Sequence, residues 1–279
     1  MRRALFSLIA SAGILAAQGN PDWHRPFPEF RIAGNIYWVG TADLAVYLVK
    51  TPAGDILINT DFDQDVPLIQ KSIEQTGAKI SDVKIILVSH AHDDHVAGTA
   101  ALKKLTGAKL MVMQPDVAEI ESGGQGDFQY QSHWTPVKVD RVLHDGDTVK
   151  LGGTTLVAHL TPGHTKGCTT WTTTVTENSR PLNVVIIGSP NVNPGYKLVV
   201  NDKYPDIVRD YEKTFAVLKS LPCDVFLGAH GAYFGLKAKY EKYKAGDTNA
   251  FIDPQGYKAY VSERESAFRR ELARQSAQR

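Results

Sequence analysis

The heptapeptide at residues 89–95, Ser-His-Ala-His-Asp-Asp-His, constrains the fold and chemistry of this chain more than any other feature. It places three imidazoles and a carboxylate within six positions, at His90, His92, Asp94 and His95. Nitrogen and oxygen donors at this density are the ligands that a borderline-soft cation such as Zn²⁺ prefers. A solvated polar turn is the alternative interpretation, and the density of ligand-type side chains disfavours it. The heptapeptide therefore predicts a metal site.

The segment before the heptapeptide predicts where this site lies. The apolar run Ile85–Val88 indicates a buried strand, and α/β proteins bind ligands beyond the carboxyl ends of their strands. His90 and His92 are two positions apart, so they project to the same side of an extended segment. Asp94 and His95 follow a turn, and we expect them to face a second point nearby.

Two further histidines lie in a similar context. His164 is at the tip of a tight Pro-Gly loop, and His230 follows the apolar run 224–227 between small residues, which allow close backbone approach. From spacing alone, each could be a metal ligand or a structural histidine. The other histidines lack this context: His24, His133, His144 and His159.

The hydrophobic pattern predicts two similar halves, each with antiparallel strands followed by strand–helix units. We expect two β-sheets packed face to face, helices outside them, and the metal ligands on loops at one edge. A Gly-, Gln- and Ser-rich stretch is expected to form a flexible surface loop over 121–134. Expected strands lie within 30–51, at 55–60, 85–88, 109–113, within 142–160, and at 168–175, 183–188 and 225–228. Expected helices cover 66–76, 96–105, 207–219 and 262–276.

Length, charge and the N-terminal composition limit the class of protein. A chain of 279 residues suits one large domain or two small ones. Its net charge of +1 gives no strong electrostatic attraction to nucleic acid. Arg2 and Arg3 precede an apolar stretch that is too short to span a bilayer. We interpret residues 1–19 as a signal peptide, with an uncleaved anchor as the alternative. The mature domain, 20–279, is then exported to the periplasm and free of the membrane.

Export makes disulfides possible, but the chain has two cysteines, Cys168 and Cys223, and therefore at most one bridge. They do not form a Cys-x-x-Cys zinc motif. A single bridge and two unpaired thiols both remain open.

Together these residues resemble the metallo-β-lactamase superfamily, over nearly the whole mature chain. The resemblance is carried by the heptapeptide, a Pro-Gly-His loop and a Gly-x-His-Gly loop, which supply His90, His92, Asp94, His95, His164 and His230. Within the superfamily the chain looks like class B, subclass 3. The segments that are similar to this subclass are 161–165, 170–172, 193–196 and 221–224.

The resemblance implies an α+β fold, a four-layer αββα sandwich, with two zinc ions in a groove at the sheet edges. One zinc ion would be held by His90, His92 and His164. The other would be held by Asp94, His95 and His230. The implied activity is zinc-dependent hydrolysis of the β-lactam ring of penicillins, cephalosporins and carbapenems by a metal-bound hydroxide. Asp94 would be the catalytic residue, and the enzyme would be a monomer.

Two absences in the sequence bear on the subclass. Subclass 1 completes its second zinc site with a cysteine, and this chain has none between Cys168 and Cys223, so His95 takes that place. Glyoxalase-like relatives bridge their metals with an aspartate in the region of 184–196, which here contains no Asp or Glu. We therefore expect no bridging carboxylate.

The sequence also departs from the family pattern. Asn59 stands where an aspartate commonly supports the metal site, which removes a charge. Tyr257 stands where the usual disulfide partner of Cys223 would be. Ser189 and Asn193 are nominated as substrate contacts. Another dinuclear zinc hydrolase of the same fold, such as a lactonase or esterase, and a non-catalytic zinc-binding protein remain the alternative functions.

Overall fold

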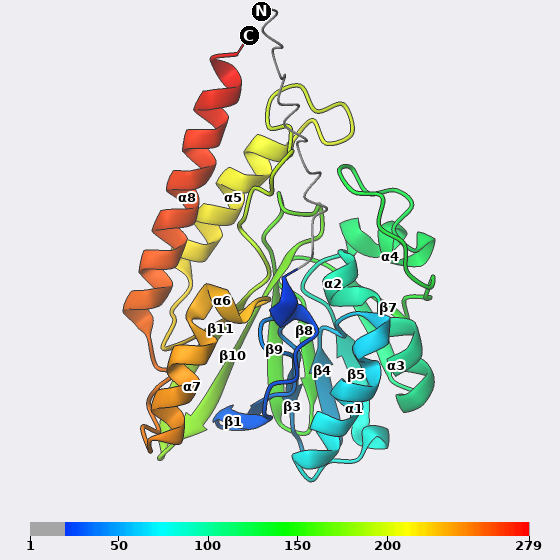
Figure 1. Cartoon of the computed structure of the whole chain (residues 1–279), viewed down its shortest axis with the longest axis vertical. Helices are drawn as coiled ribbons and strands as arrows, with labels where there is room; N and C mark the ends of the chain where they lie inside the picture. The colour runs from blue at the N-terminus through cyan, green and yellow to red at the C-terminus, as the bar shows by residue number, and fades with distance from the viewer. Residues whose placement is uncertain (1–19, 279) are drawn as a thin grey trace, which may run out of the picture.

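Two β-sheets packed face to face form the centre of the molecule, and helices cover both outer faces (Figure 1). The structure is a computed structural model that describes residues 20–278. The predicted signal peptide at 1–19 therefore lies outside the described residues. The predicted αββα sandwich is confirmed.

The first sheet has seven strands in sequential order, and its second half is parallel. Parallel neighbours need crossover connections, which contain helices α1 (Val66–Gln75) and α3 (Thr99–Thr106). The strands are β1 (Phe30–Ala33), β2 (Ile36–Trp38), β3 (Tyr47–Val49), β4 (Asp55–Ile58), β5 (Val83–Leu87), β6 (Lys109–Met113) and β7 (Arg141–Leu143).

The second sheet has five strands in the order β12-β11-β10-β9-β8, antiparallel except for the β11–β12 pair. Its strands are β8 (Thr148–Leu151), β9 (Thr154–Leu160), β10 (Thr169–Glu177), β11 (Arg180–Ile187) and β12 (Val225–Gly228). The helices that follow α3 are α4 (Val117–Ser122), α5 (Ile207–Ser220), α6 (Gly231–Phe234), α7 (Leu236–Lys244) and α8 (Pro254–Ser276). Within residues 20–278, no helix is both long and apolar enough to cross a membrane.

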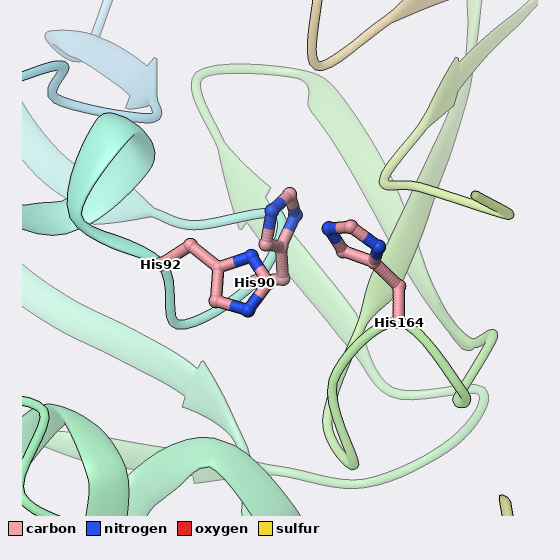
Figure 2. A group of neighbouring side chains, drawn as sticks. All are labelled: His90, His92 and His164. Carbon is pink, nitrogen blue, oxygen red and sulfur yellow. The ribbon is translucent and has the colours of Figure 1, made fainter. Parts of the chain in front are cut away.

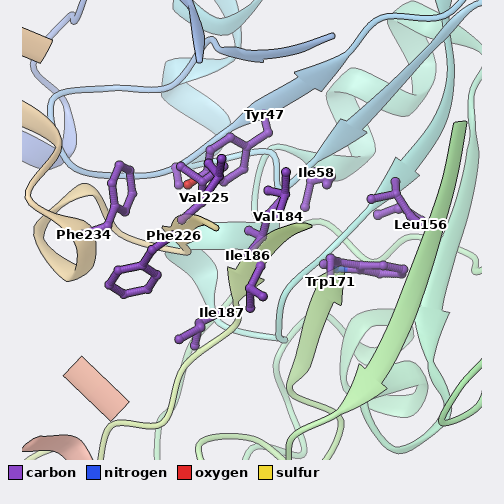
Figure 3. Close-up of a cluster of buried hydrophobic side chains, with 14 of the residues drawn as sticks. Tyr47, Ile58, Leu156, Trp171, Val184, Ile186, Ile187, Val225, Phe226 and Phe234 are labelled. Atoms are coloured by element: carbon purple, nitrogen blue, oxygen red, sulfur yellow. The ribbon is translucent and has the colours of Figure 1, made fainter. Parts of the chain in front are cut away.

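The central strands are buried on both faces, which explains why they read as continuous apolar runs. In β4, Ile56 and Ile58 pack into the core between the sheets, whereas Leu57 packs beneath α1 and α3. Tyr47 and Ile58 of the first sheet belong to one buried cluster with Leu156, Trp171 and Val225 of the second (Figure 3). Burying one such aliphatic side chain contributes about 1.5–3 kcal/mol. This core holds the two sheets, and hence the loops at their edges, in a fixed relation.

The helix expected over 96–105 is interrupted. A short helix, α2 (Asp93–Val96), contains the end of the heptapeptide, and α3 starts only after Gly98. A Cβ atom at Gly98 would lie 2.5 Å from the carbonyl oxygen of Thr60, so this residue must be small. Asp94 and His95 therefore lie on a helical turn, rather than in the turn before a helix.

Two other expected segments also differ. The last helix starts at Pro254 instead of Ser262, because Asp253 accepts a hydrogen bond from the Gly256 amide and a proline begins the first turn. The first two residues of the loop expected over 121–134 belong to the end of α4. The end of this loop is held against α4, because the Trp134 indole is buried and donates a hydrogen bond to the Ile120 carbonyl at 3.3 Å.

Both cysteines are free in the described part of the chain, 20–278, so the bridge that the sequence left open does not form. The Cys168 thiol is buried and accepts a hydrogen bond from the Ser189 amide at 3.2 Å. Burial raises the pKa of Cys223 to about 12. Tyr257 donates its hydroxyl to the Leu218 carbonyl at 2.6 Å.

Candidate metal centre

Three loops at one edge of the sandwich bring all six predicted ligand residues together. The heptapeptide leaves β5, His164 lies on the connection between β9 and β10, and His230 follows β12. Asn59 fixes the start of the heptapeptide, because its side-chain oxygen accepts a hydrogen bond from the Ser89 amide at 2.8 Å. It adopts a left-handed conformation (φ 66°), which asparagine tolerates better than most residues.

His90, His92 and His164 form the first group of candidate ligands. One ligand atom from each lies within 4.8 Å of the others. Their ring centroids are 4.6–4.9 Å apart, and all three side chains are buried. Figure 2 shows the three imidazoles turned toward one another, His90 and His92 from one loop and His164 from the opposite loop.

Asp94, His95 and His230 form the second group. The Asp94 Oδ2 atom lies 3.3 Å from His95 Nε2 and 3.4 Å from His230 Nε2. His90, Asp94 and His95 also place one ligand atom each within 4.8 Å of the others. His90 therefore borders both groups, which form one continuous centre.

The protonation of these side chains suits a cation. Burial lowers the pKa of His92 to about 4 and that of His95 and His164 to about 3. The rings are therefore neutral at pH 7 and offer lone pairs. Burial opposes the charge of Asp94, but attraction to His95 and His230 lowers its pKa well below the ordinary value. At pH 7, the neutral imidazoles of His92, His95 and His164 thus lie around the ionised carboxylate of Asp94.

Unpartnered polar atoms provide a test of whether a metal fits. Both ring nitrogens of His95 and the Nε2 atom of His92 are buried and have no hydrogen-bond partner among residues 20–278. Leaving a buried polar group unpaired costs about 1–3 kcal/mol. A metal ion bound through nitrogen lone pairs would compensate for this cost, so the donor set fits a metal.

Hydrogen bonds orient two of the histidines. His164 Nδ1 lies 2.9 Å from the Asn191 carbonyl oxygen, which makes Nδ1 the donor and leaves Nε2 free to bind a metal. The same carbonyl accepts the Tyr211 hydroxyl at 2.6 Å. His230 Nδ1 lies 3.1 Å from Asp43 Oδ2. Sequence reasoning missed Asn191 and Asp43, since neither stands near a ligand in the sequence.

Asp43 is built to hold His230. Its carboxylate also accepts hydrogen bonds from the Trp23 indole at 3.1 Å and from the Ala232 amide at 2.8 Å. Burial disfavours charge on His230, but the nearby carboxylates of Asp43 and Asp94 raise its pKa to about 9 in the metal-free protein.

We expect Asp43→Asn to weaken metal binding at the second group by about 10–100-fold, because an amide holds the imidazole less firmly than a carboxylate does. Zinc titration against a chromophoric chelator would measure this loss. Asp202→Asn, an exposed loop residue, is the matched control and should bind zinc like the parent protein. Parent-like affinity in Asp43→Asn would contradict the role given to this carboxylate.

The buried histidines also predict the pH dependence of stability in the metal-free protein. Unfolded histidines titrate near pH 6.5, whereas burial lowers the pKa values of His90, His92, His95 and His164 in the folded state. The unfolded chain therefore binds more protons in acid. The free energy of unfolding should fall as the pH drops from 6.5 toward 4, by up to about 1.4 kcal/mol per pH unit for each histidine.

His230 acts in the opposite direction, since its folded pKa of about 9 contributes stability below pH 6.5 that is lost as the pH rises through 9. Denaturant unfolding of the metal-free protein at several pH values would test both trends. A free energy of unfolding that stays constant from pH 7 to pH 5 would contradict the neutral, buried state of the four imidazoles.

A cleft of about 490 Å³ opens beside the centre. Aromatic side chains of Trp23, Tyr130 and Tyr233 form part of its wall, together with His92, Asp94, His164 and His230. Apolar walls with a few convergent polar groups are typical of small-molecule sites. Of the nominated substrate contacts, Asn193 lines this cleft. Ser189 is buried, with its hydroxyl 3.2 Å from that of Tyr233.

Known proteins are similar to this chain in both sequence and structure. The family model described as the metallo-beta-lactamase superfamily matches residues 44–174. The native FEZ-1 metallo-β-lactamase from Legionella gormanii is 53% identical, with a TM-score of 0.89 over 90% of this chain and 98% of that chain. The class B3 di-zinc metallo-β-lactamase LRA-12 from an Alaskan soil metagenome is 34% identical, with a TM-score of 0.86 over 90% of this chain and 96% of that chain.

Curated relatives match a shorter part of the chain. A hydroxyacylglutathione hydrolase of Rhodopseudomonas palustris (strain BisB5) is 31% identical over 119 residues, which is 43% of this chain and 39% of that protein. The chain thus aligns with less than half the length of this relative. The structural similarity, by contrast, extends over nine-tenths of the chain.

Proposed function

Because this chain belongs to the metallo-β-lactamase superfamily, we propose that it is a zinc-dependent β-lactamase acting on penicillins, cephalosporins and carbapenems. The observation that carries the proposal is the placement of Asp94 between His95 and His230, with no cysteine at this group. This arrangement is the one implied for subclass 3. The similarity to the FEZ-1 metallo-β-lactamase over nine-tenths of the chain supports it.

Two zinc ions, one at each group, would polarise the lactam carbonyl and lower the pKa of bound water to roughly 7. The protein side chains have three other tasks. Asp94 stays ionised at neutral pH and can accept a hydrogen bond that orients the attacking water. Trp23 and Tyr130 restrict the position of the substrate in the cleft, and Asn193 can donate a hydrogen bond to it. Ser189 lies behind Tyr233 and would act on the substrate through that residue.

A second candidate function is hydrolysis of a thioester, lactone or simple ester at the same centre. The match to hydroxyacylglutathione hydrolases favours it, although it covers 43% of the chain. The segment 188–196, which packs against His164 through the Asn191 carbonyl, contains no Asp or Glu. A carboxylate bridge of the glyoxalase type is therefore missing from this position, which favours the β-lactamase.

A substrate panel decides between these functions. Purified, zinc-loaded protein would be tested on a penicillin, a cephalosporin, a carbapenem, a glutathione thioester and an acyl-homoserine lactone, each with and without a chelator. We expect hydrolysis of β-lactams that the chelator abolishes and added zinc restores. Intact β-lactams together with thioester or lactone turnover would support the second candidate. Bound zinc with no turnover of any substrate would indicate a non-catalytic zinc-binding protein.

We further propose that residues 1–19 are a cleaved signal peptide and that the mature single domain, 20–279, is a periplasmic monomer. The basic residues Arg2 and Arg3 before an apolar stretch support export. Cell fractionation with mass spectrometry of the mature N-terminus tests the first part, and size-exclusion chromatography with light scattering tests the second. Intact Met1 in purified protein, or a dimer mass, would contradict the corresponding part.

A further inference from the structure

The short loop after β6 carries a buried carboxylate that the proposed chemistry does not use. Asp116 lies three residues beyond the end of β6, in a 3₁₀ turn at Gln114–Asp116. Strand β6 is the parallel neighbour of β5, so both strands deliver their following loops to the same edge of the sheet. Asp116 therefore reaches the heptapeptide from the side, and its side chain is buried.

The Asp116 carboxylate joins the two loops that carry the first ligand group. Its Oδ2 atom accepts hydrogen bonds from the Ala91 amide at 3.0 Å and from the Thr165 hydroxyl at 2.7 Å. Its Oδ1 atom accepts the Gly167 amide at 2.6 Å. Ala91 stands between His90 and His92, and Thr165 directly follows His164. Each loop is thus held within one residue of its ligands.

The close approach of these loops depends on a glycine. A Cβ atom at Gly167 would lie 2.6–2.7 Å from the backbone nitrogen, Cβ and Cγ atoms of Asp116, so a larger residue would push the loop away. A second link, from the Thr169 amide to the Ser89 carbonyl at 2.7 Å, joins the same loops at their bases. On the second loop, Thr169 lies well beyond His164 in the sequence, whereas Asp116 holds Thr165, the residue next to His164.

We propose that Asp116 is a positioning residue, whose carboxylate sets the separation between the His90–His92 pair and His164 and thereby tunes metal affinity at this group. The proposal rests on the metal centre described under the proposed function. It requires no contact between Asp116 and the metal or the substrate. An amide at this position would turn its NH₂ group toward at least one of the three donors, and so break the link.

The test compares Asp116→Asn and Thr165→Val with Glu119→Gln. Glu119 lines the same cavity as Asp116, but its side chain accepts only the Gly126 amide among the described hydrogen bonds. Three quantities would be measured: zinc affinity by chelator competition, the absorption spectrum of the cobalt-substituted protein, and thermal unfolding of the metal-free protein. The spectrum reports ligand geometry, which a merely structural residue would not change.

We expect zinc affinity to fall about 10–100-fold in Asp116→Asn, as for other groups that orient metal ligands, with a shifted cobalt spectrum. In Thr165→Val, which removes one of the three donors, zinc affinity should fall by a smaller factor. Glu119→Gln should match the parent protein in both zinc affinity and cobalt spectrum. Parent-like affinity and spectrum in Asp116→Asn would overturn the proposal. If that variant does not fold without metal, Thr165→Val decides by the same criterion. A parent protein that binds no zinc would instead contradict the metal centre itself.

Discussion

Replacing His92 with alanine is expected to remove metal from the first group and to lower kcat for β-lactam hydrolysis by at least about 10³-fold. His92 is one of the three imidazoles in this group, so its loss leaves His90 and His164 as the remaining histidine ligands there. Metal ions contribute several kcal/mol to stabilising charge in such reactions, and about 4 kcal/mol corresponds to a 10³-fold change in rate. Metal content by mass spectrometry and steady-state kinetics would measure both effects.

A matched control is available for this variant. His159 lies on β9, half-buried and 2.8 Å from the Thr172 hydroxyl, away from both ligand groups. His159→Ala should keep full zinc content and parent-like turnover. Full zinc content with undiminished activity in His92→Ala would show that His92 is not a ligand.

Replacing Asp94 with asparagine is expected to lower kcat by about 10²–10⁴-fold, the range for loss of a positioned proton acceptor. The change keeps the shape of the side chain but removes the negative charge that lies 3.3 Å from His95 and 3.4 Å from His230. We therefore also expect weaker metal binding at the second group, with the first group still loaded. Kinetics together with the zinc-to-protein ratio would separate these two effects.

Asp65→Asn is a suitable control for the second variant. Asp65 is also buried and also pairs with a histidine, His24 at 2.7 Å, but it does not line the cleft. Equal losses of activity in Asp65→Asn and Asp94→Asn would mean that the loss of any buried carboxylate lowers activity. The effect could then not be assigned to Asp94 as a metal ligand.

Local sequence patterns were sufficient to predict much of the site. A buried strand followed by ligand-type side chains identifies the heptapeptide and His230, and a Pro-Gly turn identifies His164. The structure brings these side chains together, and their role as zinc ligands stays a prediction. The double-sided burial within β4 and β5 follows from their apolar runs 56–58 and 85–87.

The supporting residues could not be predicted in the same way. Asp43 meets His230 across 187 positions, and Asp116 meets Thr165 across 49. Such contacts leave no periodic signal, because only the folded sheets bring the partners together. For Asp116, the parallel pairing of two predicted strands could have placed their following loops at one edge. The break at Gly98 depends on a contact with Thr60, which spacing does not reveal.

The position of Trp23 has a practical consequence for handling the protein. Trp23 and Asn20 line the cleft, and the Trp23 indole binds Asp43, the partner of His230. An affinity tag fused directly ahead of residue 20 would emerge at the mouth of the cleft and compete with substrate for space there. A tag after the last helix avoids this, and comparing kcat/KM for the two tagged forms would measure the difference. The place of the affinity tag and the activity are therefore coupled through Asn20 and Trp23.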